Sequence, residues 1–356
     1  MLKAGIVGCG GIARGKHVPS IVKIKDVQIV ALCDIKPERM DEFIENYSLK
    51  EAKKYEDYTE MLKSEKLDVV YVLTPNDSHA PISIAAMEAG CHVMCEKPMA
   101  KTTEQAKAML DCAKKTGKIL TIGYQNRFRP DSLYLKKACE RGDLGEVYYA
   151  KAHAIRRRAV PTWGVFLDSE AQGGGPLIDI GTHALDMTLW LMDNYKIKSV
   201  RGSVYRKLAD QTEQGNAFGN WDPKEFTVED SAFGFITMEN GATILLESSW
   251  ALNTLDTGEA QVTLCGTEAG ADMKDGLRFN KIELNQQTVV KPDLTVGGVP
   301  FYEGVSHDPA DVEANNFIDS VKSGKQPMVT AEQAYVVTQV LDAIYESSKL
   351  GKEVQF

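Results

Sequence analysis

Long hydrophobic runs are missing from this sequence of 356 residues. No stretch approaches the roughly 18 consecutive apolar residues that a membrane-spanning helix needs, so we predict no membrane span. The first eight residues, MLKAGIVG, also lack the extended apolar region of a secretory signal peptide. We expect them to form a first strand instead.

Basic charge and paired cysteines are scarce as well. Lysine and arginine number 41 against 50 aspartate and glutamate residues, and a net charge of −9 argues against nucleic acids and anionic membranes as partners. Seven scattered cysteines, an odd number, make a disulfide framework improbable and favour a reducing cytoplasm. Cys91, His92 and Cys95 fit no zinc spacing, so we predict no metal site. His153 and His307 receive no role.

Strand and helix patterns alternate along the first 125 residues. Apolar runs typical of strands buried on both faces of a parallel sheet occur at 4–7, 27–33, 69–73, 92–95 and 119–122. Amphipathic segments between them predict helices at 12–24, 37–46, 78–89 and 103–116. The alternation predicts an α/β fold in which residues 1–124 form a Rossmann domain with a doubly wound parallel sheet.

The pattern changes after Gly123. Longer strand patterns at 147–155, 200–207, 231–238 and 242–252, with a hairpin turn at Asn240-Gly241, predict a large, open, mainly antiparallel sheet. Residues 125–356 should therefore form an α+β domain. Its last helix, at 331–350, is a candidate for packing back on the first domain.

A glycine-rich turn, Gly8-Cys9-Gly10-Gly11-Ile12-Ala13, directly follows the first strand and opens a helix. This context is typical of a dinucleotide site, where the glycines let the backbone approach a pyrophosphate at the helix N-terminus. The expected contacts are Gly8, Gly10, Gly11 and Ile12. A purely structural turn is the alternative.

Asp34 ends the second strand, 24 residues after Gly10, where a carboxylate can bind a ribose diol. Because this carboxylate would repel a 2′-phosphate, we expect NAD rather than NADP as the cofactor. Lys36 and Arg39 nearby leave room for NADP.

Two further motifs carry candidate chemistry. Lys97, in Glu96-Lys97-Pro98 after a strand, could orient a hydroxyl or be a solvated loop lysine, and the proline could be cis. A run of glycines at 173–175 leads into an apolar helix in which Asp179, His183 and Asp186 are spaced to share one face. This helix end could approach a ligand, or the residues could form a helix-stabilising pair.

Taken together, these elements resemble the Gfo/Idh/MocA oxidoreductases, the family of glucose–fructose oxidoreductase and inositol dehydrogenase. The resemblance covers essentially the whole chain, and it rests on 8–13, Thr74-Pro75-Asn76 with His79, 96–98, 173–186 and 330–334. It implies that Lys97, Asp179 and His183 form the catalytic group. It also implies a homo-oligomer, a dimer or tetramer formed through the open sheet face, with Phe233, Phe235, Ile244 and Leu246 as candidates.

The implied chemistry is oxidation of a secondary hydroxyl in a sugar, glycoside or cyclitol. His183 would take the hydroxyl proton as general base, since imidazole has an unperturbed pKa of about 6.5. Lys97 would hydrogen-bond the reacting oxygen, Asp179 would hold a neighbouring hydroxyl, and the hydride would pass to NAD.

Secondary candidates complete the predicted sites. The resemblance places Thr74, Pro75, Asn76, His79, Glu96, Lys97 and Gln125 near the cofactor, although His79 could equally have no ligand. Arg127 and Trp163 are candidate substrate contacts, beside Lys97, Asp179 and His183. The alternatives are an arginine that ties the domains together and a packing tryptophan.

Two other functions stay open at this point. An enzyme with tightly held NAD could oxidise a glycoside transiently for cleavage or epimerisation. A non-catalytic dinucleotide sensor is the alternative of another class, disfavoured by the intact set of Lys97, Asp179 and His183.

Overall fold

The computed structural model describes residues 1–294 and 308–356, and His307 lies outside them. Packing divides the chain into two compact units. The first, called here the Rossmann unit, contains Met1–Gln125 and the described residues 308–335. The second, the sheet unit, contains residues 126–294 and Val336–Phe356. The sequence prediction placed one boundary at 124 and named only the last helix, 331–350, as packing back on the first domain. It did not anticipate that residues 308–330 group with the N-terminal residues.

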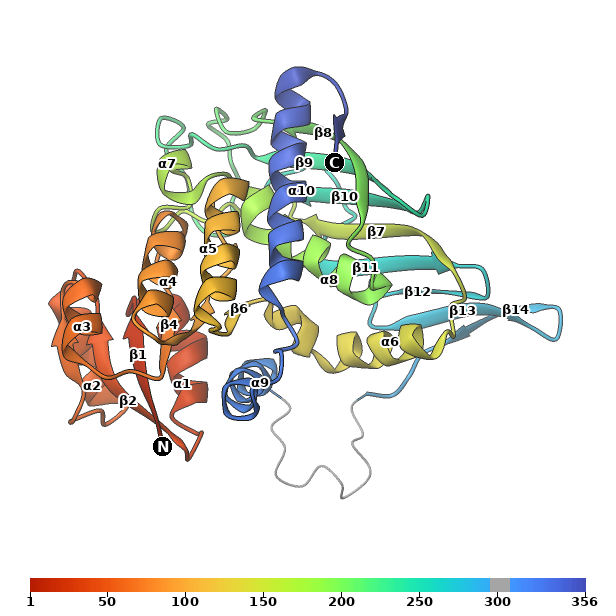
Figure 1. Cartoon of the computed structure of the whole chain (residues 1–356). Helices are drawn as coiled ribbons and strands as arrows, with labels where there is room; N and C mark the ends of the chain where they lie inside the picture. Colours follow the sequence, from red (N-terminus) through yellow and green to blue (C-terminus); the bar gives the residue numbers. More distant parts are fainter. Residues whose placement is uncertain (295–307) are drawn as a thin grey trace. The chain divides into compact units, whose positions relative to one another are not determined.

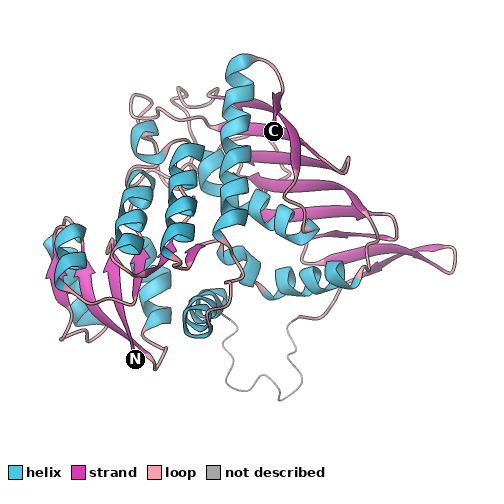
Figure 2. Cartoon of the chain, in the orientation of Figure 1, coloured by secondary structure: helices cyan, strands magenta, loops and turns pink. Residues whose placement is uncertain are grey.

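The Rossmann unit is built on a six-stranded parallel sheet (Figures 1 and 2). Its strand order is β3-β2-β1-β4-β5-β6, so the order reverses between β1 and β4, and the predicted doubly wound sheet is confirmed. The strands are β1 (Leu2–Val7), β2 (Val27–Cys33), β3 (Lys53–Tyr55), β4 (Val69–Val72), β5 (His92–Cys95) and β6 (Leu120–Ile122).

The Rossmann unit also contains several helices. The regular ones are α2 (Pro37–Asn46), α3 (Tyr58–Ser64), α4 (His79–Glu88), α5 (Thr103–Thr116) and α9 (Pro309–Ser323), with a short 3₁₀ turn η2 (Asn76–Ser78). The first helix, predicted as one element over 12–24, consists instead of a π-helical turn η1 (Ala13–His17) followed by α1 (Val18–Ile21). Such π-helical turns are rare and occur often at functional sites.

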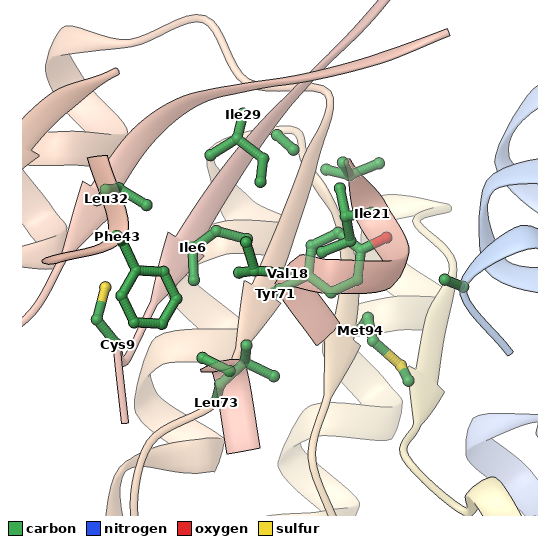
Figure 3. Packing of buried hydrophobic residues seen from close by; sticks show 14 of the residues in the cluster. Ile6, Cys9, Val18, Ile21, Ile29, Leu32, Phe43, Tyr71, Leu73 and Met94 are labelled. Atoms are coloured by element: carbon green, nitrogen blue, oxygen red, sulfur yellow. The ribbon is translucent and has the colours of Figure 1, made fainter. Parts of the chain in front are cut away.

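The core of the Rossmann unit consists of apolar side chains from its sheet and from α1, α2 and α9. Figure 3 shows part of it, where Ile6, Leu32 and Tyr71 of the sheet pack together. Ile6, Leu32 and Tyr71 are fully buried in it. Phe317 of α9 packs edge-on against Tyr71, with ring centroids 5.5 Å apart. The segment 308–323 therefore supplies part of the core, which is why it groups with the N-terminal residues.

The sheet unit contains nine strands in the order β14-β13-β12-β11-β7-β10-β9-β8-β15. Among these described strands only β7 and β10 pair in parallel, which confirms the predicted mainly antiparallel sheet. The bounds are β7 (Val147–Ile155), β8 (Ile197–Tyr205), β9 (Ser231–Met238), β10 (Thr243–Ser249), β11 (Gly258–Gly266), β12 (Ala269–Asp272), β13 (Arg278–Glu283), β14 (Gln286–Val290) and β15 (Val354–Gln355).

Helices cover one face of this sheet. α8 (Thr182–Met192) packs on β7 and β11, and α10 (Ala331–Leu350) approaches β9 so closely that a Cβ at Gly234 would lie 2.7 Å from Ile344 Cδ1. The other helical elements of the unit are α6 (Pro130–Arg141), α7 (Ser169–Gln172) and a π-helical turn η4 (Leu177–Gly181), and a 3₁₀ turn η3 (Gln125–Phe128) begins at the unit boundary. None of the helices among the described residues has the length and apolarity to cross a membrane.

The opposite face of the sheet carries partly exposed apolar residues. Phe235 is 48% exposed, and it pairs across the strands with the half-buried Leu245. Ile244 and Leu246, predicted for this face, are buried on the helix-covered side, so the prediction is wrong for them. Successive side chains of a strand point to opposite faces of the sheet. Because Leu245 lies on the open face, Ile244 and Leu246 on either side of it must lie on the other.

Candidate active site

The glycine turn after β1 is tightly packed at one end and open at the other. Gly8 has φ +95°, and a Cβ there would lie 2.6 Å from the Leu73 carbonyl oxygen, so only glycine fits. Gly10 and Gly11 face open space, with nothing within 4 Å of an added Cβ. Ala13 is fully buried behind them, and Ile12 is exposed. The turn is thus tightly fixed at one end and accessible at the other, which fits the predicted cradle.

Asp34 ties this turn to the end of β2. Its carboxylate accepts hydrogen bonds from the backbone N–H groups of Cys9 (2.8 Å) and Lys36 (2.9 Å). The Arg39 guanidinium lies 3.6 Å away. The side chain is buried beside the glycine turn, and the ribose contact predicted for it stays a prediction.

His79 lies between the two turns that follow β4 and β5. It is fully buried, and its ring nitrogens lie 2.8 Å from the Pro98 carbonyl oxygen and 2.9 Å from that of Thr74. Burial lowers the pKa of the imidazole below its ordinary value. These contacts join the Thr74-Pro75-Asn76 turn to the Glu-Lys-Pro turn. The geometry favours the alternative in which His79 has no ligand.

Glu96 organises a buried network at the Glu-Lys-Pro turn. Its Oε1 accepts from Lys16 Nζ at 2.8 Å and lies 2.7 Å from His17 Nε2, while its Oε2 accepts from the Lys97 backbone N–H at 3.0 Å. The Lys97-Pro98 bond is cis. A Cβ at Gly123 would lie 2.9 Å from Oε1, so a larger residue there would displace this carboxylate. The carboxylate predicted as a cofactor contact is therefore engaged in holding the backbone of Lys97.

Lys16 also reaches α9, where its ammonium group lies 2.8 Å from Glu313 Oε2. Burial alone would raise the pKa of Glu96, but the charge of Lys16 and the contact with His17 outweigh it and hold that pKa well below the usual value. Burial raises the pKa of Glu313. One buried cation thus joins two buried carboxyl groups, which sequence analysis did not foresee. A lysine and a histidine on the buried side of η1 were its only local trace.

Asp179 and His183 are singled out in the sheet unit by their exposure. Along residues 177–191, which cover η4 and most of α8, every side chain except these two is buried. Asp179 Oδ2 accepts a hydrogen bond from Nε1 of the fully buried Trp250, at 3.0 Å. Asp186, predicted to share their face, is buried. A helix otherwise committed to the core thus presents one carboxylate and one imidazole.

Glycines 173–175 serve close packing rather than a flexible approach to a ligand. Gly173, with φ +80°, ends α7, and a Cβ at Gly174 or Gly175 would collide with Tyr345 or the Glu229 backbone. Glu229 was missed by sequence analysis. Its buried carboxylate accepts from the N–H groups of Gly175 (2.8 Å) and Leu177 (3.1 Å) and from the Tyr345 hydroxyl (2.8 Å), which caps the start of η4.

We expect Glu229→Gln to lower the free energy of unfolding by about 1–3 kcal/mol. All three groups that contact the Glu229 carboxylate are hydrogen-bond donors. In the glutamine variant the amide NH₂, itself a donor, would face at least one of them and leave it without an acceptor. Thermal unfolding would measure the loss, with the exposed Glu225→Gln as control. A melting temperature equal to that of the parent protein would contradict the capping role.

Arg127 is enclosed by the sheet unit. Its Nε and Nη2 donate to Asp186 at 2.9 and 2.6 Å, and the guanidinium carbon lies 5.6 Å from the Trp190 ring centroid. The side chain is fully buried, and burial raises the pKa of Asp186. Both partners of this ion pair belong to the sheet unit. The predicted substrate role of Arg127 gains no support.

The remaining predicted contacts lie at loops. Gln125 is half-buried at the end of the Rossmann unit, and Trp163 is 53% exposed in the loop between β7 and α7. No group of three or more His, Cys, Asp or Glu side chains among residues 1–294 and 308–356 is placed to hold a metal ion.

Comparison with known proteins identifies the family to which the chain belongs. Residues 2–124 match an oxidoreductase family described by its NAD-binding Rossmann fold, and residues 136–356 match the C-terminal alpha/beta domain of the same family. The protein is an NAD-binding oxidoreductase, as predicted. It belongs to the Gfo/Idh/MocA family.

Individual relatives match over nearly full length. The chain is 37% identical to D-glucoside 3-dehydrogenase of Escherichia coli K12, covering 99% of this chain and 97% of that one. It is 25% identical to inositol 2-dehydrogenase of Salmonella paratyphi B, covering 98% and 95%. Levoglucosan dehydrogenase, solved with NADH and levoglucosan, shares the fold at a TM-score of 0.83 and 22% identity over 99% and 98% of the two chains.

Proposed function

We propose that the protein oxidises a secondary hydroxyl of a sugar, glycoside or cyclitol, with Lys97, Asp179 and His183 as its catalytic group. The observation that carries the proposal is that Asp179 and His183 alone are partly exposed along residues 177–191. The names of the glucoside and inositol dehydrogenases among its relatives support the substrate class.

Each residue has a distinct task in this proposal. The imidazole of His183 accepts the hydroxyl proton while the carbinol C–H bond breaks. The Lys97 ammonium group donates to the reacting oxygen, stabilises its developing negative charge and disfavours protonation of His183. Asp179, oriented by Trp250, accepts from a neighbouring hydroxyl. Bound NAD supplies the hydride acceptor at C4 of its nicotinamide ring.

The cofactor contacts proposed are the glycine turn 8–12, Asp34, the turn 74–76, Lys97 and Gln125. The fixed Gly8 and the open space at Gly10 and Gly11 support the first of these. The buried places of His79 and Glu96 support an indirect role for those two residues.

A panel of sugars, glycosides and inositols, incubated with NAD and followed by NADH absorbance, tests the function. NADH formation with at least one member is expected. Cleavage of a glycoside without NADH release would favour transient oxidation by held NAD. Inactivity across the whole panel would overturn simple dehydrogenase turnover.

Asp34→Ser is expected to raise the KM for NAD about tenfold and to lower the KM for NADP. The substitution removes the carboxylate that repels a 2′-phosphate and frees Arg39, now 3.6 Å from it, to pair with that phosphate. Steady-state kinetics with both cofactors measure the effect. Loss of the Cys9 hydrogen bond alone would weaken both cofactors equally, so an unchanged NAD/NADP preference would contradict the specificity role.

We also infer a homo-oligomer in the cytoplasm, formed through the open sheet face. The half-exposed Phe235 and its neighbours Phe233 and Leu245 support that face as the contact surface. Multi-angle light scattering of the purified protein would determine the number of subunits.

A further inference from the structure

Three aromatic rings from two loops of the sheet unit form a surface called here the aromatic platform. It consists of Trp163 and Phe166, between β7 and α7, and Phe218, between β8 and β9. The centroid of Trp163 lies 5.0 Å from that of Phe218 and 5.8 Å from that of Phe166, both edge-on. Trp163 and Phe218 are nevertheless 53% and 45% exposed. Clustered exposed aromatics of this kind commonly mark a binding surface.

Hydrogen bonds hold the platform in place without a ligand. The Thr162 hydroxyl donates to the Phe218 carbonyl oxygen at 2.6 Å. Asn216 accepts from the Val160 N–H at 2.7 Å and donates to the carbonyl oxygens of Val160 (2.9 Å) and Gly219 (2.7 Å). These hydrogen bonds fix the two loops to each other, so the exposed rings have a defined position. A preorganised surface loses little conformational entropy when it binds a ligand.

The platform is linked to the proposed catalytic helix through the buried side chain of Trp250. The Phe166 ring lies 6.3 Å from the ring of Trp250, centroid to centroid, and Trp250 Nε1–H donates to Asp179. Two ring contacts therefore separate the exposed Trp163 from the side chain that holds Asp179. Phe166 of the platform and Asp179 thus contact the same buried tryptophan.

We propose that the aromatic platform is an aglycone subsite, which binds the ring attached through a glycosidic bond to the sugar that is oxidised. The inference rests on the proposed function and narrows it, because it makes the preferred substrate a glycoside rather than a free sugar or a cyclitol. Aromatic faces stack on the C–H faces of sugar rings and on aryl rings, and such apolar walls with few polar groups are typical of ligand sites. Cyclitols carry no aglycone and cannot use the platform.

The test compares D-glucose, methyl glucoside and phenyl glucoside, with both anomers of each glycoside, as substrates in the presence of NAD. For the parent protein we expect kcat/KM for the better phenyl glucoside to exceed that for its methyl counterpart about tenfold. Trp163→Ala should reduce this ratio to near one, chiefly through the KM for the phenyl glucoside. Tyr148→Ala is the matched control, since Tyr148 is 55% exposed and lies at the other end of β7.

A binding measurement keeps this outcome separate from the proposed function. Calorimetric titration of phenyl and methyl glucoside, with NADH present to prevent turnover, should show the same preference and the same loss in Trp163→Ala. If no NADH forms from any sugar, the proposed function fails and the titration still decides the subsite. Equal affinities for both glycosides, or a change in oligomeric state on Trp163→Ala with an unchanged substrate ratio, would overturn the subsite.

Discussion

Replacing His183 with asparagine should lower kcat by about a hundred- to ten-thousandfold, the range for loss of a positioned general base. Asparagine keeps a polar group in the half-buried place but cannot accept the hydroxyl proton. The increase of kcat/KM with pH that reflects deprotonation of the base should disappear in the variant. Stopped-flow or steady-state NADH absorbance over a pH series measures both effects.

A second histidine provides the control that distinguishes loss of the general base from loss of stability. His153 on β7 is also in the sheet unit, where it pairs with Glu247 at 2.8 Å, and it has no role in the proposed reaction. His153→Asn should keep kcat within about threefold of the parent. If His183→Asn retained comparable activity and the same pH profile, His183 would not be the base.

Lys16→Met should destabilise the Rossmann unit by about 3–5 kcal/mol, as expected when one partner of a buried ion pair is removed. The substitution leaves Glu96 and Glu313 buried without their shared cation. Because the chain has two units, hydrogen exchange of β4 and β5 amides in urea is the suitable measurement, since it reports this unit alone. Lys97, whose N–H is held by Glu96, should also lose its position, and kcat should fall.

Lys23→Met provides the control for that prediction. Lys23 forms an ion pair at 2.8 Å with Asp311, which lies in α9 like Glu313. The side chain of Lys23 is 58% exposed. Its loss should change stability far less than the loss of Lys16, because exposed ion pairs contribute little. Equal effects of the two substitutions would contradict a special role for the buried network.

The cost of Lys16→Met should also depend on pH. In the parent, the pKa of Glu96 is depressed, so its contribution to stability is present above the ordinary glutamate pKa and is lost as pH falls. Without Lys16, burial raises that pKa, and stability is lost as pH rises. The two stability curves should therefore converge toward acid pH and separate toward neutral pH.

Sequence patterns located the regular elements well where burial imposes a strong period. Strand β2, strand β9 and helix α5 have the predicted bounds. The short strand β3, Lys53–Tyr55, was missed because its side chains are partly or fully exposed at the sheet edge and carry no apolar run. The π-helical turn η1 was missed because the sequence period does not distinguish it from an α-helix.

The candidate site shows the same division. Lys97, Asp179 and His183 could be selected because each lies in a local motif. Their supporting residues could not, since Lys16 lies 80 positions from Glu96 and Trp250 lies 71 positions from Asp179. Only the fold brings such pairs together. The reverse case is Arg127. Its position near the unit boundary suggested a substrate contact, but in the structure its guanidinium group donates to Asp186.

The contribution of α9 to the Rossmann core affects how the protein can fold during synthesis. Residues 1–125 leave the ribosome well before Phe317 and Glu313 are synthesised. At typical elongation rates, about 10–40 seconds separate the two events. During that interval Tyr71 and Lys16 lack their partners, and we expect the nascent N-terminal segment to be a client of chaperones until α9 emerges.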